Sequence, residues 1–572
     1  MVTENSGKNE MSDYDFIIVG AGSAGCALAY RLSENRDANV LLLEAGGSDG
    51  SVFIQMPAAF FMNLKRKSVN WNYETQPEPY LGGRVMACPR GKVLGGSSSL
   101  NGMAYVRGHA LDFERWAGNS LPSWSYAHVL PYYKRMESFS GGANEYRGGN
   151  GPFNVTAPDT AGPLWEAFLE ACTQAGFPSS NDTNGFQQDG FGTMEQSIHQ
   201  GRRWSTANAY LKPARDRSNL SVRTRCFATR ILMNGTRATG VEVIHAGQVE
   251  RINASCEVIL SGGAINSPQL LMVSGLGPAN HLRDHGIDVV LDLPGVGQNM
   301  QDHYDVHLQQ ACRQPVSIGP ALRPLPMAAI GLKWLLSQSG LGATNHFHAG
   351  GYIRSRPGLK QPDVQLSMVP MAVSMSSATG HGRKIIGLKG GSLAAEHGFQ
   401  IQIMPLQSYS RGRLQLRSKD PAVPPSLLFN YMKADEDRLM LRNGIRAARR
   451  IFSQSAFDSF RGEEIAPGAG VQSDDALDEF CRQNGKPTHH PCGTCAMGEN
   501  DSLAVVDEQA KELLDHPATV ELLKRLGQAR FMAVVGTSGS GKSSLVRAGL
   551  LPELHGGTMT STSIAWELSI MR

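Results

Sequence analysis

The chain has 572 residues, more than one hydrophobic core usually organises, so two or three domains are expected. Its 41% apolar and 18% charged residues exclude a disordered chain, and a net charge of +3 provides no basic surface of the kind that nucleic acid requires. The nine cysteines do not fit a secreted disulfide framework, and no run of apolar residues fits a signal peptide or a transmembrane segment. We therefore expect a cytoplasmic protein, and peripheral contact with the inner membrane stays open.

The first predicted elements are a strand over residues 15–19, a glycine turn and a helix over residues 26–32. The turn contains Gly20, Gly22, Ser23 and Gly25 in the pattern GxGxxG. Such glycines permit the tight turn, the approach of the backbone to a pyrophosphate and the packing of helix on strand. The amides at the helix N-terminus would then face the phosphates.

A second predicted strand, over residues 40–43, ends at Glu44, about twenty residues beyond the last glycine of the turn. A carboxylate at this position can accept hydrogen bonds from ribose hydroxyls. A glycine-rich turn without a ligand is the alternative, but strand, helix and acid in register favour dinucleotide binding. The pattern does not distinguish NAD from FAD.

A second glycine-rich segment, residues 91–108, suggests a backbone that lies close to a ligand. It resembles the first signature of the glucose-methanol-choline (GMC) flavoproteins, and residues 263–277 resemble the second. The blocks at residues 219–223, 293–303 and 490–498 also resemble the family in order, and the resemblance, strongest to choline dehydrogenases, runs over about residues 13–509. It implies FAD as cofactor, with candidate contacts in this segment at Gly95, Gly96, Ser97, Asn101 and Gly102. The FAD is expected to be noncovalent, because Leu100 precedes Asn101 where covalently flavinylated relatives present a histidine.

The resemblance implies an α/β flavoprotein with two intertwined domains. The discontinuous Rossmann-like FAD-binding domain is expected in residues 13–155, 205–305 and 487–509. An α+β substrate domain with an antiparallel sheet is expected in residues 156–204 and 306–486. Within the latter, patterning predicts strands over residues 400–404 and 413–417 and a helix over residues 435–452.

The expected reaction is the oxidation of a primary alcohol to an aldehyde by hydride transfer to flavin N5, which requires a base for the hydroxyl proton. A lone histidine is more often structural, but His490 opens the block that resembles the family's HPxGTC motif, and we predict it as the base. His489 is given at most a supporting or structural role. The substrate is choline or another small alcohol, and His348 and Ser367 replace residues of choline-oxidising relatives, which favours another alcohol. The electron acceptor, a quinone, a carrier or oxygen, stays open.

Cys492 and Cys495 form a single CxxC within the same block. One such pair is poor evidence for zinc, and we interpret both residues as packing residues rather than redox groups. No metal site is expected.

Residues 510–572 depart from the family pattern. A strand predicted over residues 531–535 leads into a P-loop that contains Gly536, Gly541, Lys542 and Ser543, in a tail that resembles a truncated STAND-type P-loop NTPase. This short α/β tail could hold ATP and Mg²⁺, but with only the phosphate cradle present we expect no hydrolysis. The family's later motif, which carries a second active-site residue, is missing from the pattern. The alternative function is therefore a catalytically impaired flavoprotein or a nucleotide-binding fusion protein that acts by interaction.

Overall fold

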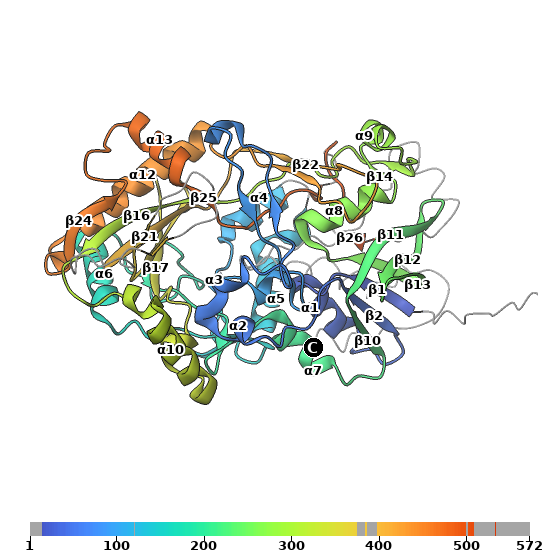
Figure 1. Ribbon diagram of the computed structural model, residues 1–572, viewed down its shortest axis with the longest axis horizontal. Coiled ribbons are helices and arrows are strands. Elements are labelled where there is room, and N and C mark those ends of the chain that lie inside the picture. Colours follow the sequence, from blue (N-terminus) through green and yellow to red (C-terminus); the bar gives the residue numbers. More distant parts are fainter. Residues whose placement is uncertain are drawn as a thin grey trace, which may run out of the picture.

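The computed structural model describes residues 14–118, 121–374, 384–385, 397–498, 502–507 and 532–533. It begins with β1 (Tyr14–Val19), α1 (Ser23–Leu32) and β2 (Val40–Glu44), the predicted strand, helix and strand (Figure 1). β2 is buried throughout and β1 is buried at residues 16–18, both with apolar runs, as strands of a parallel sheet covered on both faces should be.

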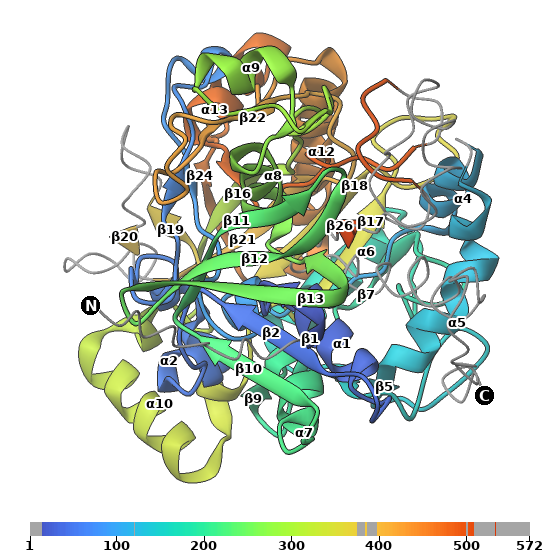
Figure 2. The same cartoon turned by 90° about the vertical axis from the view of Figure 1, so that its right-hand side faces the viewer.

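The first large sheet is parallel in one half and antiparallel in the other (Figure 2). The parallel half contains β10 (Leu220–Thr224), β2, β1 and the end of β13, and the early part of β13 turns back through β12 and β11. The last three strands are β11 (Cys226–Asn234), β12 (Arg237–His245) and β13 (Gln248–Leu260). The short strand β26 (Met532–Ala533), within the predicted strand 531–535, pairs in parallel with the end of β13.

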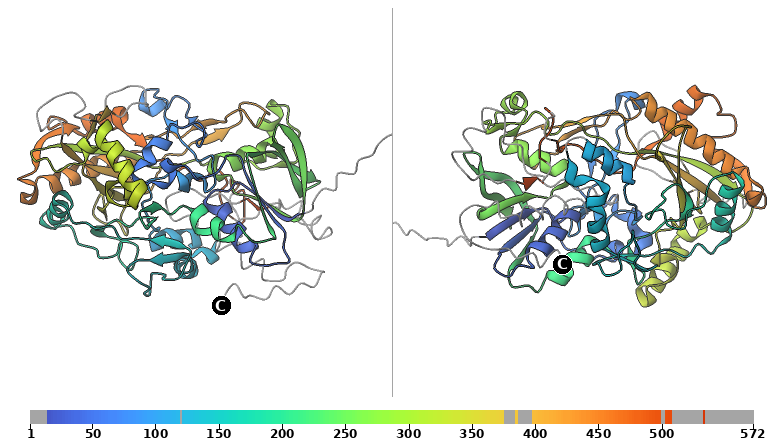
Figure 3. Two further views of the ribbon diagram at one scale, coloured as in Figure 1. Left: turned by 60° about the horizontal axis from the view of Figure 1, so that its bottom comes forward. Right: turned by 180° about the vertical axis from the view of Figure 1, so that it is seen from behind.

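The second large sheet is antiparallel throughout and lies at the other end of the molecule (Figures 1 and 3). Its strands, in spatial order, are β24 (Arg461–Ala466), β16 (Tyr304–Cys312), β21 (Gly398–Pro405), β18 (Val364–Val369), β17 (Ala349–Ile353) and β7 (Gly190–Thr193). The short β25 (Lys486–Pro487) pairs with β16. β21 contains the predicted strand 400–404, whereas β22 (Arg413–Gln415) forms a separate pair with β23 (Ser426–Leu428).

Helix α12 (Asp435–Phe452), at the predicted bounds, packs on this sheet. Acidic residues occupy its first turn and arginines its last, as the helix dipole favours, while one face is apolar and buried. A Cβ at Gly444 would lie 2.4 Å from Cγ2 of Ile403, so this glycine allows the close approach of helix to sheet.

The other helices of eight or more residues among the described residues surround the two sheets, and none of them is long and apolar enough to cross a bilayer. They are α4 (Ala110–Gly118), α5 (Tyr126–Met136), α6 (Pro163–Gln174), α8 (Gly263–Val273), α10 (Pro324–Ser337) and α13 (Asp474–Asn484). The predicted two-part architecture is thus confirmed in its sheets, while the domain boundaries along the chain stay predictions.

Candidate functional site

Two adjoining cavities lie between the sheets. The larger has a volume of about 1170 Å³ and the smaller about 120 Å³. Arg90, Gly91 and Ser97 line both, so together the cavities form one elongated site. Gly20, Gly22, Ser23, Glu44 and Gly96 line the smaller cavity, and Asn101, Gly102 and His490 line the larger one.

The glycine turn has the geometry that its sequence requires. Gly20 has φ +102°, and a Cβ there would lie 2.6 Å from the carbonyl oxygen of Ser261. A Cβ at Gly25 would lie 1.9 Å from the oxygen of Gly20, so only glycine lets α1 pack this closely on the turn. Gly22 caps α1 and Ser23 is its first residue, which places the N-terminal amides of the helix at the small cavity.

The second glycine-rich segment packs directly on this turn. Gly95 and Gly96 both have positive φ, and the amide of Gly95 donates to the oxygen of Ala21 at 2.8 Å. A Cβ at Gly96 would lie 2.7 Å from Cα of Gly22. A contact this close between backbones leaves no room for any other residue type at Gly96.

Glu44 is buried at the end of β2. Its carboxylate accepts hydrogen bonds from the amides of Ala21 at 3.0 Å and Gly46 at 2.8 Å. Burial raises the pKa of Glu44 to about 7, although these two amides oppose the shift. The side chain therefore lies at the small cavity, as a ribose acceptor must.

Glu44→Gln is expected to weaken FAD binding by roughly tenfold or more, because a charge-assisted hydrogen bond is replaced by a neutral one. Hydroxyl donors from a bound ribose favour the ionised carboxylate and so lower its pKa below about 7. Affinity in the wild type should then fall as the pH falls through about 7, and the variant should lose this dependence. Fluorescence titration of the apoprotein with FAD at several pH values measures both; a wild-type affinity independent of pH would contradict the assignment.

The remaining residues of the second segment line the floor of the large cavity. The hydroxyl of Ser97 accepts from the amide of Gly91 at 3.0 Å, and Oδ1 of Asn101 accepts from the guanidinium of Arg203 at 2.8 Å. A Cβ at Gly102 would come within 3.7 Å of Phe347 and would fill space between aromatic rings. Two adjoining cavities that share glycine-rich backbone fit a dinucleotide, with the larger cavity able to take a ring system.

His490 lies beside a second histidine, His303, in the wall of the large cavity. Their Nδ1 atoms are 3.3 Å apart and the rings are nearly perpendicular. The hydroxyl of Thr488 donates to the carbonyl oxygen of His303 at 3.1 Å and lies 3.2 Å from Nδ1 of His490. Since the one proton of Thr488 is used, its oxygen can only accept from Nδ1–H of His490, and in the neutral imidazole Nε2 is then the unprotonated nitrogen.

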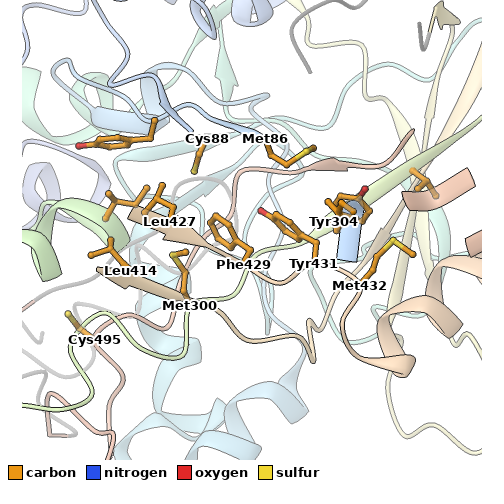
Figure 4. Packing of buried hydrophobic residues seen from close by; sticks show 14 of the residues in the cluster. Met86, Cys88, Met300, Tyr304, Leu414, Leu427, Phe429, Tyr431, Met432 and Cys495 are labelled. Carbon is orange, nitrogen blue, oxygen red and sulfur yellow. The ribbon is translucent and has the colours of Figure 1, made fainter. Parts of the chain in front are cut away.

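Asp302 holds the backbone of both histidines. Its Oδ1 accepts from the amides of His303 at 2.9 Å and His490 at 2.5 Å, and its Oδ2 accepts from the hydroxyl of Tyr431 at 2.8 Å. Burial raises the pKa of Asp302 to about 6. Tyr431 stacks on Phe429 and approaches Tyr304, so the histidine pair rests on the hydrophobic core (Figure 4).

The block that follows His490 lines the large cavity and also packs on distant segments of the chain. Gly493 has φ +95°, and a Cβ there would lie 2.2 Å from the oxygen of Asn299. Thr494 is buried and donates to the oxygen of Ala264 in the second signature segment at 2.7 Å. All nine cysteines lie in the described part of the chain and none of them forms a disulfide. Cys492 and Cys495 both line the large cavity, and their packing role stays a prediction. Among the described residues, no cluster of side chains could hold a metal ion.

The antiparallel sheet contributes a polar wall that the sequence analysis missed. Asp305 and His307 alternate on β16 and face the cavity with Gln400 and Gln402 of β21. Gln402 donates a hydrogen bond to the carboxylate of Asp305, and Nε2 of His307 lies 3.5 Å from Oδ2 of the same carboxylate. The available signal was the alternation of Asp305, His307 and Gln309 with Val306 and Leu308 after His303.

The two positions used to argue against choline differ in location. Ser367 lines the large cavity, but His348 is not among the lining residues of the described chain. His348 bonds the oxygen of Asp159 at 2.7 Å and the hydroxyl of Thr344 at 2.6 Å, and its ring stacks on Trp165 at 4.2 Å. A side chain so engaged is structural, which removes the argument from His348 against choline.

The P-loop residues Gly536, Gly541, Lys542 and Ser543 lie outside the described residues. Their predicted roles, and the expected lack of ATP hydrolysis, stay predictions.

Comparison with known families supports the family resemblance found in the sequence. A family model described as GMC oxidoreductase matches residues 14–305, and a second model of the same description matches residues 408–513. A model described as Novel STAND NTPase 1 matches residues 516–572, which confirms the predicted resemblance of the tail.

Curated relatives and solved structures agree with these models. The chain is 48% identical over 498 residues to a protein of Brucella suis named oxygen-dependent choline dehydrogenase, covering 87% of this chain and 88% of the relative. It is 50% identical to the protein of that name in Rhizobium etli, with the same coverage. Its fold is similar to that of pyridoxine 4-oxidase from Mesorbium loti, with a TM-score of 0.80 and 27% identity over 95% of this chain and 99% of the other.

Proposed function

Since this chain belongs to the GMC oxidoreductase family and is an FAD-dependent oxidoreductase acting on alcohols, we propose that it oxidises a small cationic primary alcohol, choline first, to the aldehyde. The observation that carries this proposal is the pairing of His490 with His303 in the wall of a cavity that also contains the buried carboxylate of Asp305. The relatives' name supports choline as the first candidate.

His490 acts as the base in this proposal. Its unprotonated Nε2 accepts the hydroxyl proton of the alcohol, and bound FAD supplies the acceptor for the hydride. His303 and Thr488 hold the ring and its tautomer through Nδ1. Asp302 acts as a positioning residue, because it binds the backbone of both histidines rather than the reacting atoms.

Asp305 is the proposed partner of the substrate's cationic group. It lies on the same strand as His307 and on the same face, two residues along from His303. Quaternary ammonium groups cannot donate hydrogen bonds and are recognised by negative charge and aromatic faces. Phe60, Phe347 and Tyr352 also line the cavity and supply such faces.

Asp305→Asn is expected to lower kcat/KM for choline by roughly tenfold to a hundredfold, because a buried charge that attracts the cation is lost. The uncharged isostere of choline, in which carbon replaces the nitrogen, should be affected less than about threefold, since it carries no charge to attract. Ser367→Ala is the matched control, because Ser367 also lines the cavity but carries no charge. Equal losses for both substrates would assign Asp305 a structural role.

The alternative function is a flavoprotein without turnover, in which the departure from the family after about Gln509 removes a required residue. Anaerobic mixing of the full chain with choline and other small alcohols decides between the two. Bleaching of the flavin absorbance supports the oxidoreductase. Bound flavin that no alcohol in the panel reduces supports the impaired protein. The acceptor and the cytoplasmic location remain predictions.

A further inference from the structure

Helix α10 is apolar on both of its faces. Met327 and Ile330 on the inner face line the large cavity, and Trp334 is buried and donates to the oxygen of Gly201 at 2.7 Å. The outer face nevertheless repeats leucines at helical spacing: Leu325 is 84% exposed, Leu332 59% and Leu336 80%. A helix of this kind is typical of a surface that is covered in use.

The exposed leucines belong to a larger surface, the α10 patch, to which the neighbouring segment also contributes. The turn η1 (Pro57–Ala59) packs against η7 (Gly340–Ala343), which follows α10, and Figures 1 and 2 both place α2 (Val52–Gln55) beside α10. The patch consists of exposed side chains from both segments: Phe53, Phe61, Leu325, Leu332, Leu335, Leu336 and Leu341.

The two segments that form the α10 patch carry exposed lysines. Lys65 and Lys67 follow Phe61 and are exposed, and Lys333 is exposed on α10 itself. Neither segment contains an acidic residue, since Asp and Glu are absent from residues 50–73 and from residues 306–362. An apolar surface whose own segments contribute lysines and no acidic residue complements a bilayer of anionic lipids.

The geometry points to the α10 patch as a docking surface for an anionic lipid bilayer, and we propose that α10 lies in the plane of the membrane interface. At roughly 1.5 Å per residue, the 14 residues of α10 extend about 21 Å, less than the roughly 30 Å of hydrocarbon that a spanning helix needs. Leucines on its outer face would enter the acyl region while the lysines contact phosphate groups. Two copies of the patch facing each other would oppose like charges, which disfavours a second chain as the occupant.

Co-sedimentation of the full FAD-loaded chain with vesicles tests this surface. The chain should bind vesicles of phosphatidylcholine mixed with phosphatidylglycerol, bind pure phosphatidylcholine less tightly, and be released from the mixed vesicles by salt. Leu332→Glu and Leu336→Glu should each lower the partition coefficient at least about tenfold. Lys65→Gln and Lys67→Gln should each lower it about fivefold on the mixed vesicles only.

Val249→Glu is the matched control, because Val249 is 64% exposed on β13, in the other sheet. This variant should bind vesicles as the wild type does. Circular dichroism and flavin absorbance confirm that each variant is folded, and the lysine variants provide a test that places no new charge among the leucines. Failure of the wild type to bind the mixed vesicles, or binding by the leucine variants equal to wild type, would overturn the proposal. A dimer that Leu336→Glu dissociates, without any vesicle binding, would assign the patch to a second copy of the chain.

Discussion

His490→Ala is expected to slow the reduction of bound FAD by the alcohol about a hundredfold or more, while the content of bound flavin stays near that of the wild type. The loss should be large because the hydroxyl proton must leave as the hydride does, and water is a poor substitute for a placed imidazole. Flavin binding should be little affected, because the glycine turn, Glu44 and the second glycine-rich segment come from other parts of the chain.

Anaerobic stopped-flow measurement of flavin bleaching gives the rate directly, without dependence on the electron acceptor. His489→Asn is the matched control: it changes the adjacent imidazole, and asparagine tolerates the left-handed backbone found there, with φ +67°. This control should keep its rate within a few-fold of wild type. An unchanged rate in His490→Ala would make His490 structural and leave His303 as the candidate base.

Gly25→Ala is expected to abolish FAD binding, with an affinity loss of at least about a hundredfold, or to prevent folding of the first sheet. The added methyl group would lie 1.9 Å from the carbonyl oxygen of Gly20 and 3.3 Å from the side chain of Ser261. The first of these atoms is backbone in the turn, so relief requires α1 to move away from β1 and the cavity to change shape.

Gly331→Ala provides the matched control for the same change of residue. A Cβ at Gly331 meets no atom within 4 Å, and the position lies inside α10, where alanine is favoured over glycine by about 1 kcal/mol. This variant should bind FAD normally and unfold at the same or a higher temperature. Isolation of Gly25→Ala as a yellow protein with wild-type affinity would show that the backbone contact at the turn can relax.

Much of the local structure could be predicted from the sequence. β1, α1, β2 and α12 appear at or near their predicted positions, because each has a run or a period of apolar residues that is complete within the element. The strand predicted at residues 413–417 shows the limit, since β22 forms there but pairs with β23 outside the large sheet. Pairing depends on partners that lie elsewhere in the chain, and a short strand contains no information about them.

The residues that the structure gathers at the two cavities could be chosen from the sequence only in part, for a similar reason. Gly20, Gly22 and Gly25 could be chosen because their spacing is local, and His490 because a family block surrounds it. The contact between His303 and His490 joins residues 187 positions apart. Asp305 lines the cavity because of the register of β16 against β21. The packing of Gly96 on Gly22 likewise exists only in the folded chain.

By itself, the sequence therefore determined the elements, the family resemblance and the dinucleotide turn, because helix and strand periods, turn glycines and motif spacing are properties of contiguous residues. Only the tertiary structure decided which side chains share a cavity. It showed that His348 is engaged by Asp159, Thr344 and the Trp165 ring rather than lining the cavity. It also packed η1, from the acid-free segment 50–73, against η7, from the acid-free segment 306–362. The burial of a side chain and the charge of a surface depend on segments that are distant in sequence, and only the fold brings those segments together.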